Sequence, residues 1–98
     1  MFYQQGEVIL DQLAARPKGL KKLTTKVLVR GKSTSNDHKV AGAGAVFKIA
    51  EDLFLNVTGK CSLKHPEHLP IDLLKGWYAI KLVREYDHFA EEARAVED

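Results

Sequence analysis

Four residues carry side chains suited to a transition metal: His38, His65, Glu67 and His68. Pro66 lies between two of these histidines and makes a rigid loop that could hold ligands. Neutral imidazoles and a carboxylate suit zinc, iron or manganese, and one open position would allow metal-assisted hydrolysis or oxidation. The helical HExxH spacing is absent, so a surface loop making ordinary hydrogen bonds is the alternative interpretation.

Four lysines in the first third of the chain are candidates for phosphate contacts: Lys18, Lys21, Lys22 and Lys26. Two of them, Lys22 and Lys26, would point the same way on a strand. No aromatic residue lies among them between Tyr3 and Phe47. Because single-strand-binding barrels set stacking rings beside a basic groove, nucleic-acid binding is an alternative that the sequence does not favour.

Aromatic and charged residues gather toward the C-terminal end. Candidate interface residues are Trp77, Tyr78, Arg84, Tyr86 and Phe89. Such side chains are frequent anchors at protein interfaces. One face of any strand in a small β fold must pack into the core, so core packing and structural ion pairing are the competing explanations.

Nucleophilic catalysis has no support in the chain. Thr34 and Ser35 belong to no Ser-His-Asp arrangement, and Cys61 has no helix N-terminus to activate it. The run around Gly42 and Gly44 contains G-x-G without a third glycine at dinucleotide spacing, so it predicts a bulge or strand bend.

The elements that must position these residues are mostly short strands. Residues 7–16 would be acceptable as a helix ending at Pro17, but Val8–Leu10 suits a buried strand and the strand is favoured. Residues 24–30 alternate and are β-branched, which predicts a strand followed by a loop over 31–37.

Residues 38–41 predict a strand that ends at the glycine bend of 42–44. Segments 45–50 and 53–57 flank a two-residue break and predict a hairpin, followed by a turn at 58–60. The segment 65–70 holds two prolines and is excluded from a central strand. Residues 76–85 form the longest alternating run, which puts Tyr78, Ile80 and Leu82 on one face and Trp77, Ala79, Lys81 and Val83 on the other.

A short helix is expected over 87–98, capped by Asp87. The pattern as a whole predicts one mainly β domain over 1–98, a small antiparallel barrel or sandwich of about seven short strands with a C-terminal helix.

Composition narrows the biological context. The single cysteine excludes an internal disulfide. No run is long enough to span a membrane, and the N-terminus lacks the pattern of a signal peptide, so we expect a cytoplasmic protein with no membrane partner. Residues 1–50 hold nine Lys/Arg against three Asp/Glu, and residues 51–98 hold six against ten. A basic and an acidic patch would favour head-to-tail self-association or an anionic partner.

Four segments resemble a family of small uncharacterised proteins from bacteria and tailed phages. They are residues 3–9 (YQQGEVI), 34–40 around His38, 63–71 (LKHPEHLPI) and 76–87, from GWY to REYD. The family tends to read Thr-Gly-His-x-His before its second strand group, whereas this chain has Asn36 where the first histidine would be. The resemblance implies a β-rich fold and a bacterial or phage origin, without an established activity.

These observations favour a non-enzymatic assembly or interaction module, such as an accessory or decoration-like virion protein. We expect self-association or a place in a larger protein assembly, and no cofactor. The alternatives are a metal-binding domain or metal-dependent enzyme holding a divalent transition metal, and a nucleic-acid-binding small barrel.

Overall fold

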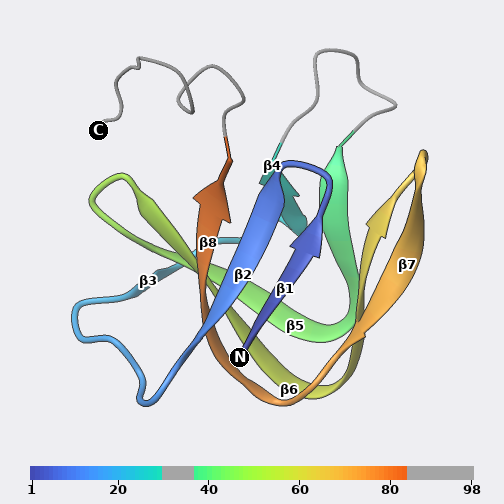
Figure 1. The fold of residues 1–98 in the computed structure, drawn as a ribbon. Coiled ribbons are helices and arrows are strands. Elements are labelled where there is room, and N and C mark those ends of the chain that lie inside the picture. The colour runs from blue at the N-terminus through green and yellow to red at the C-terminus, as the bar shows by residue number, and fades with distance from the viewer. Residues whose placement is uncertain (30–36, 84–98) are drawn as a thin grey trace.

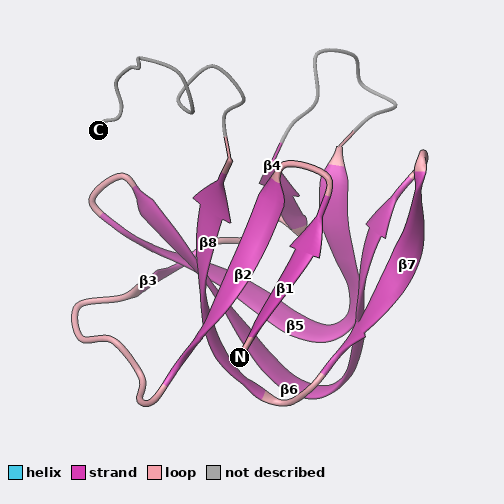
Figure 2. Ribbon diagram, in the orientation of Figure 1, coloured by secondary structure: helices cyan, strands magenta, loops and turns pink. Residues whose placement is uncertain are grey.

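The structure, a computed structural model, describes residues 1–29 and 37–83. Strands account for 71% of these residues, and the described part contains no helix (Figure 2). The eight strands are β1 (Phe2–Gln5), β2 (Val8–Leu13), β3 (Lys21–Lys22), β4 (Val27–Val29), β5 (His38–Ile49), β6 (Asp52–His65), β7 (His68–Leu73) and β8 (Gly76–Leu82). The prediction of a mainly β domain is confirmed.

All eight strands belong to one antiparallel sheet (Figure 1). Its order is β1-β2-β8-β6-β5-β3, with β4 on the first half of β5 and β7 on the second half of β6. No backbone ladder joins the ends of this described sheet, so the sheet is not closed and the predicted barrel or sandwich is not confirmed. The expected helix over 87–98 lies outside the described residues. Within the described part, no helix is long and apolar enough to cross a membrane.

The long β5–β6 hairpin bends where its register shifts between Gly42 and Gly44. Gly42 has φ +103°, and a Cβ there would lie 2.3 Å from the carbonyl oxygen of Lys60. Only glycine fits so close to another backbone. The predicted bend is therefore confirmed, whereas the turn predicted at 58–60 is wrong because β6 continues through those residues beside the bulged partner.

The core lies between the two halves of the bent sheet. The largest fully buried side chains come from both halves: Val8, Leu10, Val46, Leu55, Val57, Leu63 and Tyr78. They follow the two-residue alternation of β2, β5, β6 and β8. The strand predicted at Val8–Leu10 is confirmed over the helical alternative, since Val8 and Leu10 are inward and Ile9 is outward.

Side chains bridge the gap between β1 and β7, which we call the β1–β7 seam. The side-chain amide of Gln5 donates to the Leu63 carbonyl at 3.1 Å and to the Leu69 carbonyl at 2.9 Å. The backbone N–H of Leu74 donates to the Tyr3 hydroxyl at 3.2 Å. The open edge of β1 is thus held against β7 by hydrogen bonds that no regular ladder supplies.

Candidate functional site

Three histidines from separate places in the sequence meet at one end of the β1–β7 seam. The ring centroids of His38 and His65 are 4.2 Å apart, those of His65 and His68 are 4.7 Å apart, and those of His38 and His68 are 5.9 Å apart. His38 begins β5 and is 3% exposed, whereas the other two flank the β6–β7 turn. The fold therefore joins the three histidines that the sequence singled out.

Gln5 determines which nitrogen of His38 carries the proton. Because the Gln5 amide nitrogen donates to two carbonyls, the atom facing His38 Nδ1 at 3.1 Å is the oxygen Oε1. An amide oxygen only accepts, so Nδ1 of His38 must be the donor. Gln5 is 3% exposed and makes all three of these bonds, which tie β1 to β5, β6 and β7.

His65 is held in the opposite tautomer. The backbone N–H of Glu67 donates to His65 Nδ1 at 3.0 Å, so the proton of the neutral ring lies on Nε2. That nitrogen could bind a metal only after losing its proton or after the turn bond breaks. Glu67 contacts His65 through this backbone hydrogen bond, and the side chain of Glu67 is exposed to solvent.

Across residues 1–29 and 37–83, no group of three or more His, Cys, Asp or Glu has a geometry that could hold a metal ion. The rings of His38, His65 and His68 nevertheless lie together, with Glu67 beside them in the turn. The ring nitrogens of His38 and His65 take part in hydrogen bonds, and the three rings pack against one another at this end of the β1–β7 seam.

Burial lowers the pKa of His38, and the nearby His65 and His68 lower it further, while the carboxylate of Glu7 raises it. An imidazole removed from water resists protonation, and neighbouring cations would oppose it further. Neutral His38 is thus the form that the β1–β7 seam accommodates. Gly6 leaves room for this packing, because a Cβ at its φ of +59° would lie 2.8 Å from His68 Nε2.

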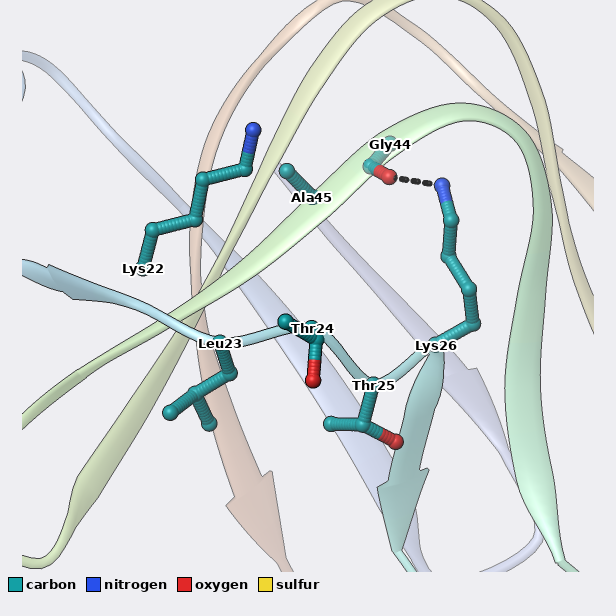
Figure 3. Close-up of a pocket in the computed structure, with 7 residues that line it drawn as sticks. All are labelled: Lys22, Leu23, Thr24, Thr25, Lys26, Gly44 and Ala45. Atoms are coloured by element: carbon teal, nitrogen blue, oxygen red, sulfur yellow. Dashed lines mark hydrogen bonds between the residues drawn. The ribbon is translucent and has the colours of Figure 1, made fainter.

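The four predicted lysines separate into different environments. The ammonium of Lys26 donates to the carbonyls of Gly42 and Gly44, so it stabilises the bend. Figure 3 shows the bond to Gly44. Lys22 lines the same cavity, of about 520 Å³, together with Leu23, Thr24, Thr25, Lys26, Gly44 and Ala45. Lys18 and Lys21 are exposed. Lys21 lies directly opposite Lys48.

Of the predicted interface residues, Tyr78 lies in the core at 0% exposure and donates its hydroxyl to the Leu74 carbonyl at 2.6 Å. Burial, followed by the nearby Tyr3, raises the pKa of Tyr78 to about 12. Trp77 points to the opposite face and is half-buried. Arg84, Tyr86 and Phe89 lie outside the described residues.

Trp77 has neighbours that the sequence pattern did not identify. Its ring centroid lies 5.1 Å from that of Phe47, and the guanidinium of Arg16 lies 5.6 Å from it. Phe54 is directly opposite Phe47, which is itself directly opposite Lys22. The register between strands determines which of these residues are neighbours, whereas alternation within one strand indicates only that each of them faces outward.

Comparison with known proteins identifies a family and no closer relative. No curated protein and no solved structure matches the chain. The family model described as "Domain of unknown function (DUF8820)" matches residues 4–82, which include the seam residues from Gln5 to His68. The resemblance predicted membership of an uncharacterised family, and the match confirms that much of the prediction. Since the match covers most of the sequence, the chain belongs to the DUF8820 family.

Proposed function

We propose that this protein is a non-enzymatic interaction module that self-associates along the β1–β7 seam. The observation that carries the proposal is where the exposed large apolar side chains lie. In the described part they are Met1, Phe2, Leu69, Leu74 and Leu82. Phe2 lies in β1 and Leu69 in β7, Met1 directly precedes β1 and Leu74 directly follows β7, and we call these four residues the apolar strip.

The exposure of these side chains is large enough to matter. Leu69 is 87% exposed, Phe2 is 60% exposed and Leu74 is 58% exposed. Covering a leucine or phenylalanine contributes about 1.5–3 kcal/mol. Several large exposed apolar side chains on neighbouring elements are typical of protein contact surfaces, whereas single exposed residues are ordinary.

Hydrogen bonds hold the backbone that presents this strip. The Gln5 amide donates to the Leu69 carbonyl, and the Leu74 N–H donates to the Tyr3 hydroxyl. A strip held in one conformation loses little conformational entropy on binding. A second copy would offer the same strip, which suits a two-fold, self-complementary contact.

The wider setting follows from the resemblance to bacterial and phage proteins. A small self-associating β domain suits an accessory or decoration-like subunit of a particle, and that is the role we propose. The buried Cys61, with a pKa raised by burial, offers no activated thiol that would favour an enzyme instead.

Sedimentation velocity over a wide concentration range tests the proposal. We expect a dimer or larger oligomer for the natural chain and a shift toward monomer for Leu69→Asp and Leu74→Asp. Leu82→Asp is the matched control, because Leu82 is exposed on β8 away from the β1–β7 seam. Circular dichroism would verify that each variant folds. A natural chain that stays monomeric throughout, or equal losses in seam and control variants, would contradict the proposal.

A further inference from the structure

We propose that a second surface binds single-stranded nucleic acid by base stacking. This surface, the aromatic face, consists of Phe47, Phe54 and Trp77 with the cations Arg16 and Lys22 beside them. It lies over β3, β5, β6 and β8 and shares no residue with the β1–β7 seam.

Register places the three rings on the outer side of the sheet. Phe47 pairs with Phe54, and its chain neighbour Val46 is buried at 0% exposure. Trp77 likewise precedes the buried Tyr78. Since adjacent strand residues point to opposite faces, Phe47, Phe54 and Trp77 share the face turned away from the core. Each of the three is half-buried, with part of its surface open to solvent.

The spacing of the rings suits the planar faces of bases. Phe47 and Trp77 lie 5.1 Å apart between centroids with an interplanar angle of 52°, and Phe54 is the directly paired neighbour of Phe47. Rings arranged side by side on a sheet can each stack with a separate base. Base pairing hides those faces inside a duplex, so a single strand is the ligand that this geometry fits.

Two cations lie beside the rings, and neither has an acidic partner among the described residues. Among residues 1–29 and 37–83, the ion pair is the one between Lys81 and Asp11, at 3.2 Å. Arg16 and Lys22 have no carboxylate partner within these residues. The guanidinium of Arg16 lies 5.6 Å from the Trp77 ring, where it could also reach a phosphate. Lys22 lies directly opposite Phe47.

Lys21 and Lys48 alternate with Lys22 and Phe47 along the paired strands, so they point to the other face of the sheet and do not add to the charge of the aromatic face. The cavity beside β5 adds two hydroxyl-bearing residues, Thr24 and Thr25, to Lys22. Figure 3 shows Lys26 bonded to Gly44, whereas Lys22 in the same cavity has no bond drawn. A phosphate backbone could pair with the Lys22 ammonium, which has no acidic partner among residues 1–29 and 37–83.

Trp77 is the only tryptophan, so intrinsic fluorescence reports stacking at this face directly. The probes are a fluorescein-labelled oligothymidylate, the oligouridylate of equal length and a mixed-sequence duplex of that length. Trp77 emission is followed with unlabelled strands, and anisotropy is followed with labelled ones. We expect saturable quenching by both single strands, weaker binding of the duplex, and an affinity that falls linearly with salt on logarithmic axes.

Variants locate the site. Phe54→Ala should weaken single-strand binding roughly five- to a hundredfold, the range for loss of one stacked base. Lys22→Glu should weaken it and reduce the salt slope by about one. Lys39→Glu is the matched control, since Lys39 is an exposed lysine of the same β5 strand, on its other half and opposite Lys64. We expect this control to keep most of the affinity.

Three results would overturn the inference: no quenching of Trp77 at low salt, equal affinity for the duplex, or equal weakening by Lys22→Glu and Lys39→Glu. The last result would indicate general attraction by positive charge. Lys22 is an exposed residue, so its variant remains informative even if Phe54→Ala fails to fold. The outcome is separate from that of the association experiment, because neither surface contains a residue of the other.

Discussion

Gln5 connects more of the fold than any aromatic or charged residue at the β1–β7 seam. Its amide bonds to two carbonyls and to His38 Nδ1, so one buried side chain links four strands. Buried polar groups that keep every partner satisfied stabilise one arrangement, and those that lose a partner are costly. The tautomer of His38 depends on this glutamine.

We expect Gln5→Ala to lower the free energy of unfolding by about 2–4 kcal/mol, since it leaves two carbonyls and a buried imidazole N–H without their partner. Urea denaturation measures this change. Gln4→Ala is the control, because Gln4 is exposed and its side chain makes a single bond to the Gly6 carbonyl. The control should cost less than about 0.5 kcal/mol. Similar losses for both variants would refute the special role of Gln5.

His38 should make stability depend on pH. Its pKa in the folded protein lies below the ordinary value of 6.5, chiefly because of burial and then because of His65 and His68, with Glu7 opposing them. The unfolded chain therefore binds the proton more readily than the folded one. Stability should be full above pH 6.5 and should fall as the pH drops below that value toward the lowered pKa.

Urea unfolding at a series of pH values from neutral to mildly acidic checks this sign. His38→Asn keeps a side-chain N–H for Gln5 and removes the titrating ring, so its stability should vary less with pH over the same interval. A pH dependence that is unchanged in His38→Asn would assign the effect to other groups.

The β5–β6 hairpin is the element that determines the shape of the sheet. Its bulge at Gly42–Gly44 allows the first half of β5 to pair with β4 while the second half pairs with β3. Lys26 donates hydrogen bonds to the carbonyls of Gly42 and Gly44 at the bulge. A bulge also increases local twist, which turns the two halves toward one core.

Gly42→Ala should destabilise the protein by about 2–4 kcal/mol, because the new Cβ meets the Lys60 carbonyl and the backbone is left-handed. Gly19→Ala separates these two causes. Gly19 has φ +79°, and nothing lies within 4 Å of an added Cβ. Gly19→Ala should therefore destabilise the protein by only about 1–2 kcal/mol, which is the cost of placing alanine in a left-handed backbone conformation. Guanidinium unfolding of both variants measures the difference, and equal costs would show that the Lys60 contact is unimportant.

Two surfaces and one core organise the whole molecule. The two halves of the sequence interleave, since β2 pairs with β8 and β5 pairs with β6. Lys39 of the first half consequently lies opposite Lys64 of the second, and Asp11 pairs with Lys81. The uneven charge of the two sequence halves is thus redistributed over shared strands.

At this scale we predict that association and single-strand binding are independent. Leu69→Asp should reduce the oligomer while leaving quenching of Trp77 by oligothymidylate unchanged, and Lys22→Glu should do the reverse. Sedimentation and fluorescence on the same two variants provide the measurement. Loss of both properties in either variant would show that the surfaces are coupled.

The sequence by itself indicated a mainly β fold and several of its strands, although it predicted no strand at β3 or β7 and placed a turn at 58–60 where β6 continues. Alternation along residues 76–82 correctly separated Tyr78 from Trp77, and the glycines at 42–44 correctly predicted a bend. These are local properties, because the pleat of a strand and the freedom of glycine act within a few residues. The unusual histidines were also identifiable from sequence, although their contacts were not.

Only the tertiary structure decided which residues meet. Nothing in the sequence distinguishes Gln5 from a surface glutamine, and its hydrogen bonds form only because β1 lies beside β7. Likewise, Lys26 differs from the other lysines only because the bulge places two carbonyls within its reach. Phe47, Trp77 and Lys22 come together through pairings between strands far apart in the chain. Register between distant strands follows from how all the strands pack around one core, so no single segment contains it.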